Sequence, residues 1–117
     1  MQLQNSETVD RLSLLLEYLK EDPGDAFTRF ALAMEYVKTG NEVRALETFE
    51  ALVGDQPDYV GTYYHLAALY LRKGLTDEAL ETYRAGIRIA DRQRDTHARA
   101  ELQSALLEAE GFGFDDE

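Results

Sequence analysis

The chain has 117 residues, a size typical of one domain, and its 44% hydrophobic and 30% charged content is ordinary for a folded, soluble protein. Its net charge of −11 argues against a nucleic-acid-binding protein, which needs Lys and Arg to neutralise phosphates. It contains no Cys, which excludes disulfides and Cys-based zinc sites and fits a reducing, cytoplasmic location.

The N-terminal segment predicts one amphipathic helix over residues 6–21. Its apolar residues recur every three or four positions and form one stripe: Val9, Leu12, Leu15, Leu16 and Leu19. The longest apolar run, Leu14–Leu16, is far shorter than the roughly 20 residues of a membrane span, and the segment lacks the pattern of a secretory signal. We therefore expect this helix to pack on protein, and we expect no membrane partner.

Residues 26–59 predict two helices separated by a glycine. In the first helix the apolar residues have three- and four-residue spacing: Phe27, Phe30, Met34 and Val37. Gly40 is expected to end this helix, because glycine adopts the left-handed conformation at low cost, and Asn41 to cap the next. The second helix ends before Pro57 and carries a further apolar set: Ala45, Leu46, Phe49, Leu52 and Val53.

Residues 60–93 repeat this plan 34 positions later. A helix from Tyr63 ends at Gly74, Thr76 is expected to cap the next helix, and Asp77 and Glu78 place negative charge in its first turn. Ten positions are identical between 24–57 and 58–91: Thr28/Thr62, Leu32/Leu66, Ala33/Ala67, Tyr36/Tyr70, Gly40/Gly74, Ala45/Ala79, Leu46/Leu80, Glu47/Glu81, Thr48/Thr82 and Ala51/Ala85. The chain therefore contains an internal repeat.

Residues 94–109 predict a last helix with one apolar face, made of Ala98, Leu102, Ala105 and Leu106. The acidic tail 111–117, GFGFDDE, is either a loose end or a segment that docks on this chain or another. Five arginines lie nearby: Arg84, Arg88, Arg92, Arg94 and Arg99. They either compensate a helix dipole and face solvent, or form a site for an acidic partner such as the tail.

The spacing L-A-x-x-Y-x-x-x-G-x-x-x-x-A-L-x-x-[FY], present twice, resembles the tetratricopeptide repeat, a 34-residue helix–turn–helix unit. The resemblance implies an all-α fold, an alpha-alpha superhelix: a short right-handed solenoid of about six antiparallel helices in a single domain over 1–110. Residues 6–21 are then half a repeat, 26–59 and 60–93 are full repeats, and 94–109 is a capping helix.

The resemblance also assigns roles to small residues. Ala33 and Ala45, like Ala67 and Ala79, stand where paired helices would cross closely. Gly86 is small where the next helix would stack. The pattern departs from the family at Arg29, where an aromatic residue or Leu is usual, at Leu52, where a small residue is usual, and at Asp91, where Pro is usual.

Little in the sequence indicates catalysis. The only imidazoles, His65 and His97, are 32 residues apart on different predicted helices, and we expect the first to be half-buried and the second solvated. No nucleotide-binding or hydrolase motif and no spaced carboxylate pair is present. We therefore predict no enzyme activity, no cofactor and no metal.

The remaining function is binding. The resemblance implies that the first helix of each pair lines an inner groove for a peptide or partner helix, with these residues: Phe27, Phe30, Met34, Lys38, Tyr64, His65, Ala68, Leu71 and Arg72. Aromatic residues and Met suit an apolar segment rather than the carboxylate that some family members hold with a basic clamp. An alternative for Phe27, Phe30 and Met34 is burial by the N-terminal helix. An alternative function is weak self-association through exposed stacking faces.

Overall fold

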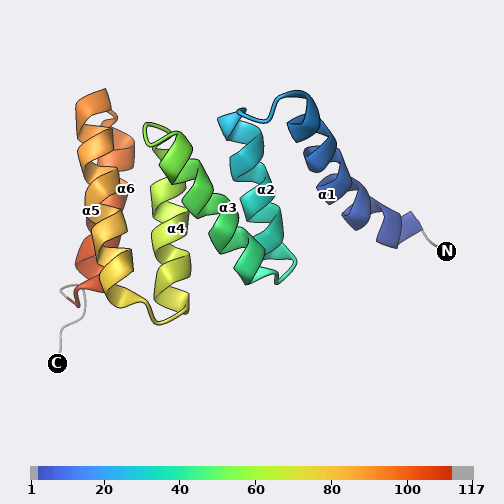
Figure 1. Cartoon of the computed structure of the whole chain (residues 1–117). Helices are drawn as coiled ribbons and strands as arrows, with labels where there is room; N and C mark the ends of the chain where they lie inside the picture. Colours follow the sequence, from blue (N-terminus) through green and yellow to red (C-terminus); the bar gives the residue numbers. More distant parts are fainter. Residues whose placement is uncertain (1–2, 112–117) are drawn as a thin grey trace. The chain divides into compact units, whose positions relative to one another are not determined.

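The computed structural model describes the backbone of residues 3–111 and the side chains of residues 11–111. This part of the chain forms six α-helices and no strand, which confirms the all-α class (Figure 1). The helices are α1 (Leu3–Glu21), α2 (Ala26–Lys38), α3 (Glu42–Asp55), α4 (Gly61–Arg72), α5 (Thr76–Gln93) and α6 (Thr96–Ala109). The expectations for the Val9 side chain and for residues 112–117 lie outside the described residues.

The chain divides into two compact units. The N-terminal unit, Met1–Gly54, holds α1, α2 and almost all of α3. The C-terminal unit, Asp55–Glu117, holds α4, α5 and α6. The repeat boundaries at 26–59 and 60–93 stay predictions from the sequence.

Glycine ends both α2 and α4, as the sequence predicts. Gly40 and Gly74 have φ values of 82° and 79°, in the left-handed region that glycine adopts at little cost. After α2, the Asn41 N–H donates to the Tyr36 carbonyl at 2.8 Å and the Gly40 N–H donates to the Val37 carbonyl at 3.1 Å. These two bonds form a Schellman motif, which satisfies the last carbonyls of the helix. The equivalent pair of bonds ends α4.

Side-chain caps begin three helices. The cap oxygens of Asp25, Asn41 and Asp95 accept hydrogen bonds from the backbone N–H of Thr28 at 2.9 Å, Arg44 at 3.2 Å and Ala98 at 3.0 Å, respectively. The Thr28 hydroxyl also donates to Asp25. Both bonds favour the ionised carboxylate and hold the pKa of Asp25 below its usual value.

The start of α5 differs from the prediction. Thr76 is already the first helical residue, Leu75 precedes it, and no side-chain cap bond is present at this position. Asp77 and Glu78 do lie in the first turn, as predicted. Their negative charge faces the positive end of the helix dipole, and this favours the start of the helix without a cap.

The core of the N-terminal unit forms where α2 meets α3 and α1. Ala33 and Ala45 have no exposed surface, as expected for small residues at a close helix crossing. The rings of Phe30 on α2 and Phe49 on α3 are 6.0 Å apart between centroids, and Phe49 is fully buried. The two helices therefore pack through small residues and a tilted pair of rings.

The stripe predicted for α1 is narrower in the structure. Leu15 is buried, and Leu12 and Leu19 are half-buried. Leu16 is 40% exposed, so its predicted place in the buried stripe is wrong. Leu16 has the same three- and four-residue spacing, but it lies about 40° from Leu12 on the side away from Leu15 and Leu19, at the edge of the stripe. A helix that packs on one neighbour buries only a narrow arc.

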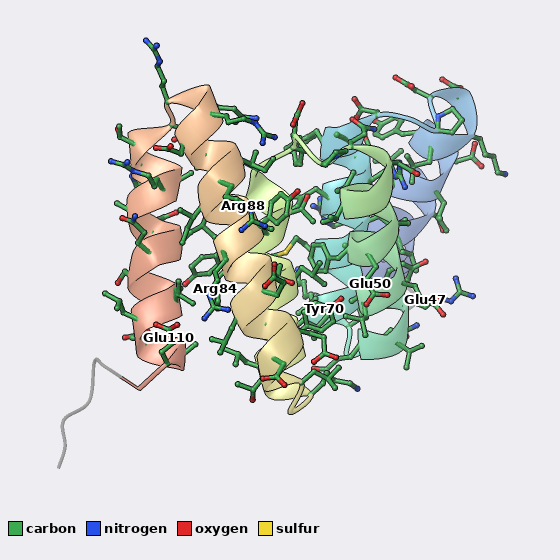
Figure 2. The ribbon with its side chains drawn as sticks, turned by 60° about the vertical axis from the view of Figure 1, so that its left-hand side comes forward. Glu47, Glu50, Tyr70, Arg84, Arg88 and Glu110 are labelled. Atoms are coloured by element: carbon green, nitrogen blue, oxygen red, sulfur yellow. The ribbon has the colours of Figure 1, made fainter. Side chains whose placement is uncertain are left out.

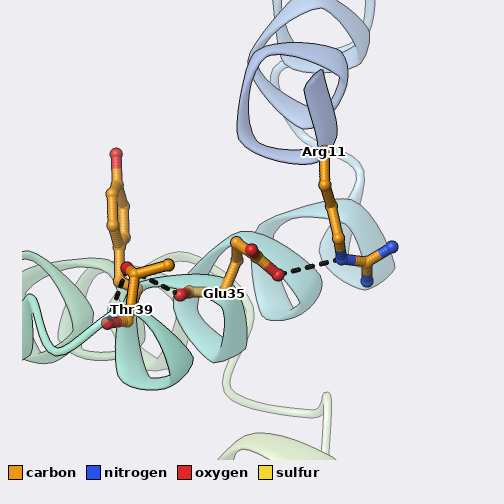
Figure 3. Close-up of polar contacts among 4 residues, drawn as sticks. Arg11, Glu35 and Thr39 are labelled. Atoms are coloured by element: carbon orange, nitrogen blue, oxygen red, sulfur yellow. Dashed lines mark hydrogen bonds and ion pairs between the residues drawn. The ribbon is translucent and has the colours of Figure 1, made fainter. Parts of the chain in front are cut away.

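A polar contact also joins α1 to α2. The Arg11 Nε donates to Glu35 Oε1 at 2.9 Å (Figure 3). The Glu35 side chain is only 4% exposed, whereas that of Arg11 is 58% exposed. Thirty-four residues later, the position of Glu35 is taken by Leu69, which is buried. The first of these two helices therefore carries a charge where the second carries an apolar residue.

In the C-terminal unit, α5 packs against both α4 and α6 (Figure 1). Ala67 and Ala79 have no exposed surface, as predicted. Gly86 of α5 fits so closely that an added Cβ would lie 2.6 Å from the Tyr63 Cβ and 3.1 Å from a Leu102 methyl group. The small residue expected at this position is thus required by neighbours on two other helices.

The end of α5 holds the segment that precedes α4. The Gln93 Nε2 donates to the Asp58 carbonyl at 2.6 Å, and Arg92 lies 3.7 Å from the Asp58 carboxylate. The Tyr63 hydroxyl donates to the Pro57 carbonyl at 2.6 Å. Burial is the main cause that raises the pKa of Tyr63, with a smaller contribution from Asp58. These contacts fix the first turn of α4, which carries the aromatic residues of the candidate site.

Candidate functional site

The nine residues predicted from the sequence lie on two helices, α2 and α4, one in each unit. On α2, Phe27 is 68% exposed and Lys38, the last residue of the helix, is also exposed. Phe30 and Met34 are half-buried. The α2 set is therefore a partly exposed strip with an apolar residue at one end and a cation at the other.

The structure decides between burial and exposure for part of this strip. Phe27 is too exposed to be buried by α1, so this alternative is wrong for Phe27. Phe30 packs on Phe49 of α3 and belongs in part to the α2–α3 contact. The residues of α2 that are buried form another set: Leu32, Ala33, Glu35 and Tyr36.

On α4, an aromatic cluster organises the predicted site. The Tyr64 ring meets the His65 ring edge-on at 5.4 Å and the Tyr83 ring of α5 edge-on at 6.3 Å, measured between centroids. Tyr64 is 41% exposed, whereas Tyr83 is buried. Edge-to-face contacts of this kind favour a defined ring orientation. Tyr64 is therefore an exposed aromatic side chain with a buried ring behind it.

The other predicted residues of α4 surround this cluster. Ala68 and Leu71 are half-buried, and Arg72 is exposed in the last turn of the helix. His65 is half-buried, as expected. Burial lowers the pKa of His65, because an imidazolium ion loses hydration there, while the nearby Glu101 carboxylate acts weakly in the opposite direction. At neutral pH the His65 imidazole is therefore neutral and contributes polarity without charge.

The structure adds residues of α6 that the sequence analysis did not select. Glu101 lies close enough to His65 to oppose the fall in its pKa, and Glu108 lies close enough to Tyr83 to contribute to the raised pKa of that phenol, which is due mainly to burial. These carboxylates belong to a helix that was predicted as a cap, and the prediction for this helix named only its apolar face. Their seven-residue spacing on one side of α6 was the signal available in the sequence.

Four of the five arginines near α5 form ion pairs with acids from several segments. Arg84 binds Glu110 at 2.9 Å. Both side chains are labelled in Figure 2. The other pairs are Arg88–Glu81 at 3.6 Å, Arg92–Asp58 at 3.7 Å and Arg99–Asp91 at 3.0 Å. These pairs favour the interpretation of solvated, dipole-compensating charge. The proposed contact with the tail falls on residues outside the described range.

The remaining candidate features are small. His97 is exposed near the start of α6, as predicted, and lies 3.3 Å from Glu101. Among residues 3–111, the side chains that are described form no cluster of three or more potential metal ligands. A pocket of about 270 Å³ lies at the turn between α5 and α6, and none of the nine predicted residues lines it. No helix of the described chain is both long and apolar enough to cross a membrane.

Comparison with known proteins supports the repeat seen in the sequence. A family model for the tetratricopeptide repeat matches residues 36–106, which is more than half of the chain. None of the curated proteins compared with the chain matches it significantly.

Solved structures give closer comparisons. A crystal structure of a tetratricopeptide repeat domain protein from Salinibacter ruber is 53% identical, covers 74% of this chain and 98% of its own, and has a TM-score of 0.72. A solution structure of such a domain protein from the same organism is 50% identical, covers 82% and 97%, and has a TM-score of 0.74.

A more distant structure has the same fold. PcrH, in complex with the chaperone binding region of PopD, is 18% identical, covers 97% of this chain and 86% of its own, and has a TM-score of 0.80. The predicted solenoid class is confirmed by these structures. Taken with the repeat pattern and the family match, they show that the chain belongs to the tetratricopeptide repeat family, whose domains are protein-interaction modules that are typically non-catalytic.

Proposed function

We propose that this chain is a non-catalytic adaptor whose exposed faces of α2 and of α4, each within its own unit, bind a peptide or helix of a partner protein. The observation that carries the proposal is Tyr64, a large aromatic side chain that is 41% exposed and oriented by ring contacts with His65 and Tyr83. Oriented, exposed aromatic residues are typical anchors of protein interfaces, because they bury a large area at little cost in side-chain entropy.

A second observation supports the α2 part of the surface. Phe27 is the most exposed of the large hydrophobic side chains whose exposure is described. It lies in the first turn of α2, next to Phe30, which is the counterpart of Tyr64 34 residues earlier in the sequence. An apolar residue of this size on the surface favours a contact with another protein.

The complex of PcrH supports the proposal at the level of the fold. In that complex the protein binds the chaperone binding region of PopD, so a chain of this fold can present a surface to a segment of a partner. The lack of Cys supports a cytoplasmic location for the interaction, since it removes any need for an oxidising compartment.

The test begins with the full chain as bait for affinity purification and mass spectrometry. The recovered partner is then titrated against Tyr64→Ala, Arg72→Glu and a control, Val43→Ala. Val43 is an exposed apolar residue on α3, outside the proposed surface. We expect Tyr64→Ala to weaken binding at least tenfold, as for an aromatic interface anchor, and Val43→Ala to leave it unchanged. Full binding by both site variants would reject the assignment.

The exposed face of α1 favours a second candidate function, self-association. Leu16 is 40% exposed, although the positions 34 and 68 residues later carry Glu50 and Arg84. Leu14 and Tyr18 of the same helix are also exposed. Leu14 and Leu16 are apolar at positions that are polar 34 and 68 residues later, and such residues suit a face covered by a second copy of the chain.

Light scattering over a concentration series tests this candidate. Self-association predicts that the apparent mass rises with concentration, and that Leu16→Glu returns it to the monomer value. A monomer at every concentration up to about 1 mM would reject self-association with a dissociation constant in or below that range. Leu107→Glu, on an exposed position of α6, is the control for an added charge.

A further inference from the structure

One face of the C-terminal unit combines aromatic and acidic side chains. We call it the α4–α6 face and define it by Tyr64 and His65 of α4 and by Glu101, Ala105 and Glu108 of α6. The two helices contact each other directly. Glu101 influences the pKa of His65, and Glu108 influences that of Tyr83, which packs behind Tyr64. The carboxylates therefore lie beside the aromatic cluster.

The arginines that contact α6 lie on its other side. Glu110 follows Glu101 by nine residues, which is about two and a half helical turns, so the two carboxylates project from opposite sides of α6. Glu110 binds Arg84 of α5, and Arg99, also on that side of α6, binds Asp91 of α5. The arginines thus neutralise the side of α6 turned away from the α4–α6 face.

The acids of the α4–α6 face lack such partners. Among the side chains described, none from Lys or Arg forms an ion pair with Glu101 or Glu108; the neighbour of Glu101 is His97 at 3.3 Å. The stretch of α4 beside them, 61–71, contains no Lys or Arg, and Arg72 follows only in the last turn. The face therefore has uncompensated negative charge next to an exposed aromatic ring.

We infer that the α4–α6 face selects an apolar segment that carries Lys or Arg. This inference rests on the proposed function and specifies the chemistry of its partner. The carboxylates of Glu101 and Glu108 meet the cationic groups, while the Tyr64 ring packs on the aliphatic stem or against the cation itself. Because charge of the same sign repels, the same face rejects an acidic segment.

Three synthetic peptides test the inference. They share one pattern of Leu and Ala and differ only in the residue at the polar positions, which is Lys, Gln or Glu. Each is titrated into the isotope-labelled full chain, and the dissociation constant is obtained from amide chemical shifts of residues 61–72 and 96–109. We expect the Lys peptide to bind several-fold more tightly than the Gln peptide and the Glu peptide not to bind.

Matched variants separate a local effect from the attraction of the whole acidic chain. Glu101→Gln/Glu108→Gln removes two charges from the face, and Glu47→Gln/Glu78→Gln removes two from exposed positions on α3 and α5. The first double variant is expected to lower the affinity for the Lys peptide about three- to tenfold, as for the loss of two partly exposed ion pairs. Its affinity for the Gln peptide is expected to stay unchanged. The second pair is expected to retain the affinity of the wild-type chain.

Three outcomes would overturn the inference. The first is that the Gln peptide binds as tightly as the Lys peptide. The second is that the two double variants weaken binding of the Lys peptide equally. The third is that none of the peptides shifts the resonances of α4 and α6. The proposed function is judged separately, by the effect of Tyr64→Ala on the natural partner. If Tyr64→Ala loses binding to the natural partner and the Lys, Gln and Glu peptides bind equally, the proposed adaptor function holds and the preference for cationic segments is rejected.

Discussion

Gly86 is the residue whose size the fold limits most directly. An added Cβ would approach the Tyr63 Cβ to 2.6 Å, and real Cβ atoms do not come this close. A methyl group of Leu102 would lie 3.1 Å away. Because Tyr63 and Leu102 belong to the packed helices α4 and α6, the clash is relieved only by moving α4, α5 or α6. Gly54 of α3 provides a contrast, because no heavy atom lies within 4 Å of an added Cβ there.

We expect Gly86→Ala to lower the free energy of unfolding by about 1–2 kcal/mol, because overpacking outweighs the gain in helix propensity. The matched change Gly54→Ala is expected to raise it by up to about 1 kcal/mol, since only the propensity term acts. Urea denaturation at equilibrium measures both values. Equal or greater stability of Gly86→Ala would show that α5 does not approach its neighbours this closely.

At the scale of the element, α1 contacts α2 through both apolar and charged residues. It buries Leu15 and half-buries Leu12 and Leu19, and it adds the bond from Arg11 to the buried Glu35 (Figure 3). A buried carboxylate needs its partner, since an unpaired one retains the full cost of its desolvation. The contact between α1 and α2 therefore includes a buried charge that needs its partner, whereas Arg84–Glu110 and Arg99–Asp91 are at least partly exposed.

We expect Arg11→Met to destabilise the chain by about 1–2 kcal/mol and to increase amide hydrogen exchange in α1. Arg11→Leu combined with Glu35→Leu is expected to recover the loss, because Leu69 occupies the equivalent position in α4 and is buried. Lys20→Met is the control: its pair with Glu17 is exposed on both sides and contributes less than about 0.5 kcal/mol. A smaller effect from Arg11→Met than from Lys20→Met would contradict this account.

At the scale of the whole molecule, charge is the dominant surface property. The chain has 23 acidic and 12 basic residues. The ion pairs described in the C-terminal unit are at least partly exposed, and each contributes at most about 1 kcal/mol. Repulsion among the excess carboxylates acts on the entire folded chain and opposes compaction.

We therefore expect the free energy of unfolding at pH 7 to increase when NaCl is raised from about 10 mM to about 150 mM, because salt screens the net repulsion over this range. The double variant Glu47→Gln/Glu78→Gln is expected to show a smaller increase, since it carries less excess charge. Urea denaturation at several salt concentrations provides the measurement. A steady fall in stability with salt would mean that the ion pairs outweigh the repulsion.

The sequence by itself determined the helical plan of the chain. Gly40, Gly74 and the Asn41 cap were predicted correctly because the bonds that they form reach only a few residues along the chain. Fully buried Ala33 and Ala67 were predicted from the repeat, because the same small residue recurs wherever the same crossing recurs. The missed cap at Thr76 shows that helix starts are less certain when dipole charge replaces a side-chain bond.

The tertiary structure decided which surfaces are open and how the charges pair. The exposure of Phe27 and Leu16 depends on which helices lie against them, and periodicity on one helix does not record this. The bond from Arg11 to Glu35 and the position of Glu101 beside His65 join residues more than twenty positions apart. Such contacts depend on the packing of separate helices, whereas the helices themselves depend on nearby residues. For this reason the fold was predictable and the chemistry of the candidate site was not.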